Sequence, residues 1–283
     1  MCNGTVKYLQ GFLADRLRSA VAPHLRPEVS RFQSALLDAP DWFLLNGGDP
    51  ALGPLGINVT GPCSVALRSR AHPVGKVQVS ASGEEGLLVI DNADWRGQFH
   101  AVIRLKGSRC TVAVCGLEGV TANLTDIFLR SAEQVLFWGF GASAVQARIE
   151  MEGAGRVLVV GDDALISSGV WIRNHDMHGI HDLKTMSLMN SPCDTIVERH
   201  VWLGQDVALM RCPRIGAGSI VAARGLANRS IERTVLVGGL PCRVLKQHIS
   251  WSRSLTAFSA REHELLNLVR SLPESAPSVV GGN

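Results

Sequence analysis

The sequence predicts an all-β solenoid, a parallel β-helix with a helical segment before it and a short helix after it. The main observation is a six-residue repeat over 197–226, in which an aliphatic side chain opens each unit: Val197, Leu203, Leu209, Ile215 and Val221. This period differs from the period of about 3.6 of an α-helix and of about two of a strand. It is typical of hexapeptide β-helices, in which three short units close one coil.

Two further features support the repeat. Small or modest side chains recur four places after each aliphatic one: Val201, Val207, Pro213, Ser219 and Gly225. We expect them near the corners, where a small side chain lets the chain turn. An earlier run has the same spacing: Val160, Ile166 and Ile172. Together these features predict columns of stacked aliphatic side chains inside the solenoid.

The period breaks between Ile172 and Val197, which are 25 positions apart rather than six. The intervening stretch has three histidines and two aspartates within eight residues: His175, Asp176, His178, His181 and Asp182. Insertions leave a solenoid as loops on one face, which is often the binding face. We therefore expect residues 174–195 to form a loop that carries the chemistry.

The chain before the hexapeptide coils divides into two parts. Residues 6–45 have apolar side chains at helical spacing, interrupted by Pro23 and Pro27, and predict helices within an N-terminal segment 1–55. Residues 58–160 contain short β-rich runs between glycine and polar turns. We expect these runs to form wider, irregular coils that continue into the hexapeptide coils, which makes one β-helix of residues 56–246. A separate β-sandwich is the alternative for this region.

The chain is expected to leave the solenoid within residues 247–283. Ser259 and Glu262 have the spacing of a capping box at a helix N-terminus. Leucine and valine side chains over 265–272 then give a short amphipathic helix that stops before Pro273. The last ten residues are small and polar, and we expect a flexible tail there.

The composition argues against several functional classes. The net charge of the 283 residues is +3, which gives no electrostatic case for binding nucleic acid. The sequence has no signal-peptide core and no apolar run long enough to span a bilayer. The seven cysteines form no C-x-x-C pair, as expected for reduced apolar side chains. These features predict a cytoplasmic protein without a transmembrane segment.

From about residue 150 to residue 253 the sequence resembles the hexapeptide-repeat acyltransferases. The resemblance rests on four stretches: 161–180 around the break in the repeat, 200–204 (His-Val-Trp-Leu-Gly), 215–224 and 238–244. The tail 248–253 is similar to members that O-acetylate cell-surface polysaccharides. Two positions depart from the family pattern, because Glu198 stands where Gly is usual and Arg224 where Lys is usual.

This resemblance implies a left-handed parallel β-helix that assembles into a homotrimer. It also implies that acetyl-CoA binds in the groove between neighbouring subunits, without a metal. The activity it implies is acetyl transfer from acetyl-CoA to a saccharide hydroxyl, in a cell-surface polysaccharide or its precursor.

The histidine-rich loop provides the candidate catalytic residues. His178 matches the position of the family's catalytic histidine. Acetyl transfer to a hydroxyl needs a base, and histidine ordinarily titrates near neutral pH. Asp176 is the nearest candidate to hold the His178 ring in the required tautomer, with a turn-forming aspartate as the alternative. His175 and His181 are expected to contact the substrate or the loop itself.

Six residues outside the loop are candidates for binding the coenzyme. Trp202 resembles the tryptophan that packs along the acyl and pantetheine arm, and the backbone N–H of Gly204 is a candidate donor to the oxyanion. Backbone groups of two alanines are candidates for the pantetheine amides, and two guanidiniums for the phosphates. These four residues are Ala222, Ala223, Arg224 and Arg243.

Other interpretations stay open on the residues alone. The fold does not fix the acceptor, so an N-acetyltransferase of an amino sugar or antibiotic is one alternative. A metal-binding protein like the γ-carbonic anhydrases is another, since His175, His178 and His181 are three apart, although that family spreads its ligands over separate coils. A non-catalytic β-helix scaffold is a third. We discount Cys193 as an acyl-accepting nucleophile, because the repeat places no base beside it.

Overall fold

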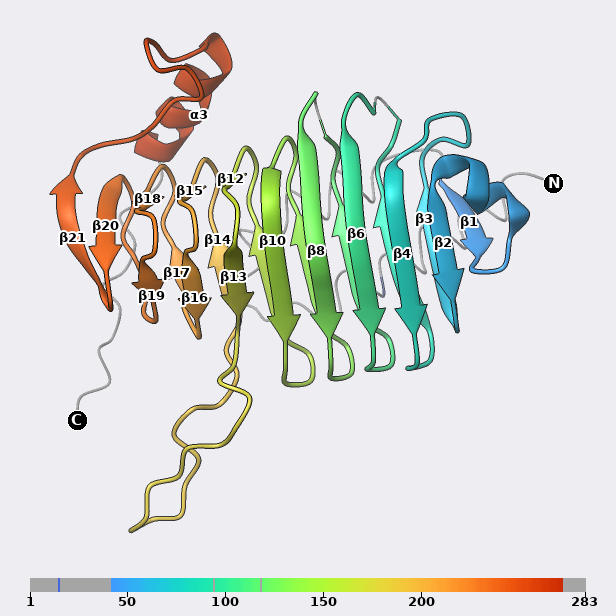
Figure 1. Cartoon of the computed structure of the whole chain (residues 1–283), viewed down its shortest axis with the longest axis horizontal. Coiled ribbons are helices and arrows are strands. Elements are labelled where there is room, and N and C mark those ends of the chain that lie inside the picture. Colours follow the sequence, from blue (N-terminus) through green and yellow to red (C-terminus); the bar gives the residue numbers. More distant parts are fainter. Residues whose placement is uncertain (1–14, 16–41, 94, 118, 272–283) are drawn as a thin grey trace.

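The computed structural model describes residue 15 and residues 42–93, 95–117 and 119–271. Over these residues the chain winds into a parallel β-helix (Figure 1). The front strands descend, the chain returns behind them, and each coil steps from right to left, which is a left-handed winding (Figure 1). The prediction of a left-handed parallel β-helix followed by a short helix is confirmed.

One wall of the solenoid is a sheet of eight described strands. Its neighbours are parallel, except that the first pair, β1 and β3, is antiparallel. In spatial order the strands are β1 (Phe43–Asn46), β3 (Cys63–Leu67), β5 (Gly86–Ile90), β7 (Thr111–Val114), β9 (Val135–Trp138), β11 (Val157–Val160), β14 (Thr195–Val197) and β17 (Arg214–Ile215).

The opposite wall is a sheet of thirteen described strands, in which the closing pair β20 and β21 is antiparallel. Its first five strands are β2 (Ile57–Thr60), β4 (Gly75–Ala81), β6 (Gln98–Leu105), β8 (Thr121–Leu129) and β10 (Ser143–Met151). Beyond β10 one row contains β12 (Leu165–Ile166), β15 (Trp202–Leu203), β18 (Ile220–Val221), β20 (Val235–Gly239) and β21 (Cys242–Gln247). A second row contains β13 (Val170–Arg173), β16 (Ala208–Met210) and β19 (Leu226–Ala227).

The solenoid changes its cross-section where the hexapeptide repeat begins. The long strand β10 pairs with β12 through its first residues and with β13 through residues 147–150, so later coils have a corner where earlier coils are straight. The residues at this corner have left-handed backbone conformations: Gly169 (φ 70°), Asp206 (φ 56°) and Arg224 (φ 59°). Strands on both sides of the transition belong to one parallel ladder, with local register shifts between β6, β8 and β10, so the β-sandwich alternative for 58–160 is wrong.

The aliphatic columns lie where the six-residue period places them. Val197 stacks on Val160 and Ile215, Leu203 on Ile166 and Val221, and Leu209 on Ile172 and Ala227. All of these side chains are buried. Three columns run along the axis because three units of six residues close one coil.

The structure differs from the sequence prediction at the N-terminal end of the solenoid. Residues 1–14 and 16–41 of the expected helical segment lie outside the described residues. The end of that segment is strand β1 and the 3-10 helix η2 (Pro50–Leu55), not a continued α-helix. Because β1 pairs antiparallel with β3, the apolar residues 43–45 belong to the sheet rather than to a helix face.

The C-terminal helix α3 (Ala260–Ser271) has the capping box that the sequence predicts. The Glu262 N–H donates to Ser259 Oγ at 3.2 Å, and the Ser259 N–H donates to Glu262 Oε2 at 2.6 Å. Leu265, Leu266 and Val269 are buried, whereas residues from 272 onward lie outside the described residues. No helix in the described ranges is long and apolar enough to cross a membrane.

A buried polar cluster fastens the segment before α3 to the solenoid. His200 Nδ1 lies 2.7 Å from Asp163 Oδ2, and the Arg253 guanidinium lies 2.9 Å from Asp163 Oδ1. Trp251 stacks on the His200 ring with 4.3 Å between ring centroids, and its indole N–H donates to the His200 carbonyl at 2.8 Å. Asp163 and His200 occupy equivalent corners of successive coils, so coil stacking creates this cluster.

Glu198, the departure from glycine, forms a second buried cluster. Its carboxylate accepts from Arg214, from Arg233 Nε at 2.8 Å and from the Ala217 N–H at 2.8 Å. Burial alone would raise the pKa of this carboxyl, but the hydrogen bond from Arg233, the charge of Arg214 and the Ala217 N–H hold it below its ordinary value. Glu198 therefore ties three stretches of the solenoid together.

The columns predict a large cost for shortening a core side chain. Leu209→Ala should lower the free energy of unfolding by about 2–5 kcal/mol, because it leaves a cavity in the column. Leu255→Ala, at a fully exposed leucine, is the matched control and should change it little. Denaturant unfolding measures both. Equal stability of the two variants would show that the register is wrong.

The Asp163 cluster predicts a pH dependence of stability. Burial would raise the pKa of Asp163, but His200 and Arg253 outweigh it and hold the pKa below its ordinary value. The contribution of the carboxylate is therefore present above about pH 4 and is lost as pH falls through the folded-state pKa. Asp163→Asn should lower stability at pH 7 and reduce the loss of stability on acidification, measured by urea unfolding at each pH.

Asp206→Asn is the control for this prediction. Both aspartates have a positive φ, which asparagine tolerates, but the side chain of Asp206 is exposed. Asp206→Asn should lose as much stability on acidification as the parent. If Asp163→Asn also loses as much as the parent, the Asp163 cluster does not contribute to the pH dependence of stability.

Candidate functional site

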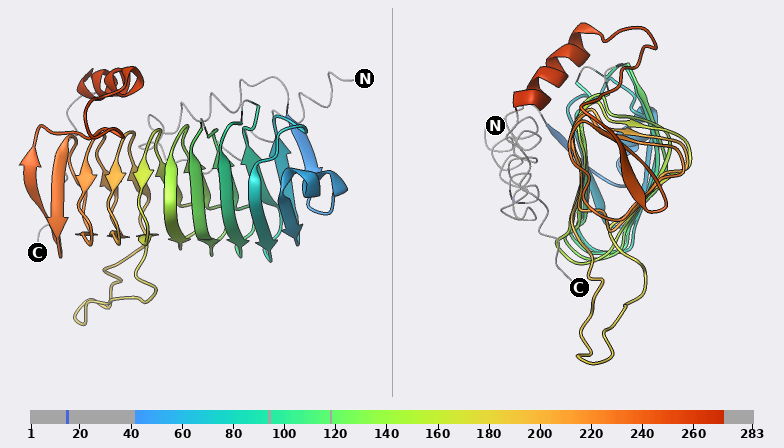
Figure 2. Two further views of the ribbon diagram at one scale, coloured as in Figure 1. Left: turned by 45° about the horizontal axis from the view of Figure 1, so that its top comes forward. Right: turned by 90° about the vertical axis from the view of Figure 1, so that its left-hand side faces the viewer.

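The expected loop is an arm that projects from the solenoid. Residues 174–194 leave the lower end of β13 and return at β14, and they extend away from the solenoid on the edge opposite α3 (Figures 1 and 2). The arm exposes a set of large apolar side chains: Met177, Ile180, Leu183, Met186, Leu188 and Met189. Such a set on a projecting segment is typical of a surface that contacts another protein.

Two asparagines hold the arm, and neither position could be recognised from the sequence pattern. Asn174 accepts from the Glu152 N–H at 2.8 Å and donates to the carbonyls of Glu152 and Cys193, which closes the base. Asn190 donates to the His178 carbonyl at 2.8 Å and accepts from the Ile180 N–H at 2.7 Å. Asn190 thereby fixes the backbone of His178.

The side chain of His178 is exposed, and among the described residues it makes no hydrogen bond. Asp176 does not hold its ring, contrary to the expected orienting role. The Asp176 carboxylate instead accepts from Asn190 at 3.1 Å and lies 3.6 Å from the Arg211 guanidinium. His181 is also exposed, in a short bridge with Leu188.

His175 lies at the base of the arm and is 2% exposed. The Met177 N–H donates to His175 Nδ1 at 3.0 Å, so the neutral ring carries its proton on Nε2. Burial lowers the pKa of His175, which favours this neutral form. Its Nε2 is buried and has no hydrogen-bond partner in the described part of the chain.

The six candidate coenzyme-binding residues come together along one corner of successive coils. Trp202 opens β15 beside Ile220 of β18, and Ile220 pairs with Leu236 of β20. The backbone ladder then joins the residues that follow these strands: Gly204 donates to Val221, and Ala222 donates to Val237. The complete row consists of Trp202, Gly204, Ala222, Ala223, Arg224 and Arg243. Both arginines in it are exposed.

One predicted role in this row is wrong. The Gly204 N–H donates to the Val221 carbonyl at 2.9 Å, so it is not free to bind an oxyanion. Gly204 is required for another reason, because a Cβ at this position would lie 2.7 Å from the Ala223 nitrogen. Glycine here lets one coil pack closely against the next.

Trp202 is the most firmly held side chain of the row. Its indole N–H donates to Ser167 Oγ at 3.2 Å, and Trp251 lies against it with 6.1 Å between ring centroids. Residues 248–253, which the Asp163 cluster fastens to the solenoid, therefore support the Trp202 ring through Trp251. The sequence resemblance included this tail but did not reveal the contact.

The arm and the coenzyme row lie on different corners of the solenoid. The arm leaves the lower end of β13, whereas β15 and β18 lie in the upper half of the same wall (Figure 1). No hydrogen bond, ion pair or ring contact in the described part of the chain joins the arm to Trp202. A single chain thus displays His178 and Trp202 separately.

The described residues contain no group of three or more His, Cys, Asp or Glu side chains arranged to hold a metal ion. His175, His178 and His181 are spaced three apart in the sequence, but they do not form such a group within one chain. Burial raises the pKa of the Cys193 thiol, which keeps it protonated and unreactive at neutral pH, in keeping with its exclusion as a nucleophile.

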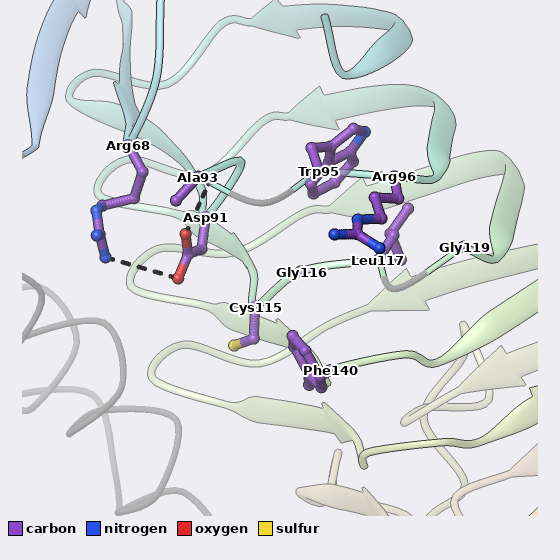
Figure 3. Close-up of a pocket in the computed structure, with 10 residues that line it drawn as sticks. All are labelled: Arg68, Asp91, Ala93, Trp95, Arg96, Cys115, Gly116, Leu117, Gly119 and Phe140. Carbon is purple, nitrogen blue, oxygen red and sulfur yellow. Dashed lines mark hydrogen bonds and ion pairs between the residues drawn. The ribbon is translucent and has the colours of Figure 1, made fainter. Parts of the chain in front are cut away.

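A cavity of about 640 Å³ lies elsewhere, at the corner loops of the N-terminal coils (Figure 3). Trp95 and Phe140 line it, together with Arg68, which lies 3.8 Å from Asp91. Arg261 of α3 packs over Phe140, which places the cavity on the edge opposite the arm. It contains none of the predicted site residues.

Comparison with known proteins gives relatives that match part of the chain. A polysialic acid O-acetyltransferase of Escherichia coli O1:K1 / APEC is 26% identical over 121 residues, 40% of this chain and 39% of that protein. One of Neisseria meningitidis is 28% identical over 131 residues, 44% of this chain and 60% of that protein. These matches span less than two thirds of either relative. No protein-family model matches the chain.

The fold has a close counterpart among solved structures. The crystal structure of the polySia specific acetyltransferase NeuO superposes with a TM-score of 0.63 and 19% identity, and covers 78% of this chain and 91% of that chain. At this identity the likeness shows the fold alone. The relatives agree with the resemblance drawn from the repeat, and the chain is a parallel β-helix with a hexapeptide repeat that is similar to polysialic acid O-acetyltransferases.

Proposed function

We propose that this protein transfers the acetyl group of acetyl-CoA to a saccharide hydroxyl, with His178 as the general base. The observation that carries the proposal is the pairing of two displayed surfaces on one chain. The arm presents an unpartnered histidine, and a separate corner presents the coenzyme row with Trp202 and two exposed arginines. The arm supplies a candidate base, and the row supplies a candidate coenzyme site.

The two surfaces meet when copies of the chain assemble as a trimer. The arm exposes Leu183 at 87% and Met186 at 69%, which is costly for side chains that remain in water. A neighbouring copy would cover them and bring His178 to the row of the adjacent subunit. Three-fold closure repeats this head-to-tail contact without leaving a free end.

The chemistry follows from the residues. The acceptor hydroxyl oxygen attacks the thioester carbonyl carbon while His178 takes the hydroxyl proton. The carbon–sulfur bond then breaks, the ester forms, and the proton passes from His178 to the coenzyme thiolate. An exposed histidine on a fixed backbone suits this role, because Asn190 holds its carbonyl and leaves the ring free to meet the acceptor.

The coenzyme row supports the donor side of the reaction. Arg224 and Arg243 are exposed on successive coils and suit phosphate groups, since guanidinium binds phosphate with paired hydrogen bonds. Trp202 offers a rigid apolar face to the pantetheine arm, held by Ser167 and Trp251. Arginine replaces the usual lysine at 224 without loss of charge.

A saccharide acceptor is supported by relatives named as polysialic acid O-acetyltransferases. An amino sugar or antibiotic acceptor remains the alternative. A panel of oligosaccharides, amino sugars and antibiotics, assayed by coenzyme release and mass spectrometry, separates these classes. Release of coenzyme A with no acceptor acetylated in any class would contradict the proposal.

His178→Ala should lower kcat by about 10²–10⁴-fold, because proton removal from the acceptor is lost. The affinity for coenzyme A, measured by calorimetry, should stay unchanged, since the base contacts the acceptor rather than the coenzyme. His263→Ala, at an exposed histidine on α3, is the control and should keep full activity. Retained turnover in His178→Ala would remove this residue from the mechanism.

Co-expression tests whether the site is shared between subunits. His178→Ala and Trp202→Ala should each be inactive alone. Mixed trimers should recover activity in about a quarter of the sites, since random assembly joins an intact arm to an intact row that often. A chain with both substitutions, mixed with the His178→Ala variant, should recover none. No recovery in the first mixture would place both residues in one subunit's site.

A further inference from the structure

Three arginines, one glutamate and two aromatic rings form a continuous surface on the outer face of the thirteen-stranded wall, with Arg104 at its edge. In parallel register, Arg104 of β6 lies beside Phe128 of β8, Phe128 beside Glu150 of β10, and Glu150 beside Arg173 of β13. Arg148 and Trp171 form the adjacent row. We call the set Phe128, Arg130, Arg148, Glu150, Trp171 and Arg173 the arginine platform.

Glu150 organises the platform from below. It is buried although it points outward, because guanidiniums cover it: Arg148 at 2.7 Å, Arg173 at 3.2 Å and Arg130 at 3.5 Å. Burial would raise the pKa of Glu150, but the charges of these arginines hold it below its ordinary value. One ionised carboxylate thus positions three guanidiniums. A second carboxylate, Asp126, pairs with Arg104 and lies 4.0 Å from Arg148, so the four guanidiniums face two carboxylates.

The aromatic rings hold the guanidiniums flat. Arg173 lies 3.7 Å from the Trp171 ring centroid, Arg148 lies 5.3 Å from the same ring, and Arg130 lies 3.9 Å from the Phe128 centroid. Stacking on a ring leaves the edge of a guanidinium available for hydrogen bonds. Arg148 remains the most open, with 49% of its side chain exposed.

Buried donors without acceptors gather at the same place. Among the described residues, Arg130 Nε, Arg173 Nε, Trp171 Nε1 and His175 Nε2 are buried and have no hydrogen-bond partner. Buried N–H groups in folded proteins are normally paired, so four donors against one acceptor without a hydrogen bond, Glu150 Oε1, indicate a site that is short of acceptors. His175 also links the platform to the base of the arm.

The surface continues along the solenoid as a polar track. The Arg104 row extends to Ser80 of β4 and Thr60 of β2, and a shallow hollow of about 250 Å³ lies over these strands. From β2 to β13 the track crosses five strand spacings, about 24 Å. This length suits a chain of several sugar units rather than a single one.

We infer that the arginine platform binds an anionic saccharide chain, which lies along this face with its carboxylates on Arg130, Arg148 and Arg173 and one hydroxyl at the arm. This inference deepens the proposed function and rests on it for the role of the bound chain. Arginine binds carboxylate in a bidentate manner, and the polar row of Thr60 and Ser80 suits sugar hydroxyls. A neutral saccharide would leave the guanidinium excess unbalanced.

Binding without acetyl-CoA tests the inference separately from the reaction. Calorimetry with oligogalacturonate and with a neutral maltooligosaccharide of equal length should detect binding of the first alone, weakening as salt rises. Arg148→Gln should weaken it on the order of tenfold, because a charged hydrogen bond is lost. Arg270→Gln, exposed on α3, is the matched control and should bind like the parent. Equal binding of both saccharides would overturn the inference.

A second variant, Trp171→Phe, and light scattering distinguish loss of saccharide binding from loss of the oligomer. Trp171→Phe keeps an aromatic ring at this position and removes one unpartnered donor, so it should weaken oligogalacturonate binding while the melting temperature stays near that of the parent. If Arg148→Gln dissociates the oligomer and leaves saccharide affinity unchanged, the platform is a subunit contact and the inference is wrong.

Acidic saccharide binding without acetyl transfer would contradict the proposed function alone. Efficient acetylation of neutral saccharides, unaffected by Arg148→Gln, would contradict this inference alone.

Discussion

Backbone hydrogen bonds between successive coils fix the height and direction of each residue relative to the residue one coil away. Leu203 stacks between Ile166 and Val221 in this way, and the same ladder sets Gly204 beside Val221 and Ala222 beside Val237. The aliphatic columns supply the apolar burial that holds the coils together. The coenzyme row, the Asp163 cluster and the arginine platform all depend on this register, because each joins residues from different coils.

The register explains what could be predicted from sequence. In the hexapeptide coils, 18 residues make one turn, so sequence distance converts directly into position, as with Leu203 and Val221. The columns and the row of candidate coenzyme residues follow from this conversion and from the family resemblance. The corner at 169, 206 and 224 is also periodic, although its left-handed conformations were not foreseen.

The structural features that could not be predicted lie where the six-residue period is interrupted or absent. The arm has no repeat to position it, so Asn190 and the Asp176–Arg211 contact gave no signal, and Asp176 was assigned the wrong partner. The coils before residue 160 differ in length, which hides the register that joins Arg104, Glu150 and Arg173. The role of Gly204 was misjudged because its N–H belongs to the ladder, as stacking requires.

In the proposed reaction the reacting groups come from two copies of the chain. A structure of the assembled protein with bound coenzyme A tests it most directly, by the distance from the coenzyme sulfur to each His178 ring. We expect coenzyme along the Trp202–Arg243 row of one subunit, with its sulfur within hydrogen-bonding reach of the neighbouring subunit's histidine. Coenzyme bound away from that row, or beside His178 of the same chain, would contradict it.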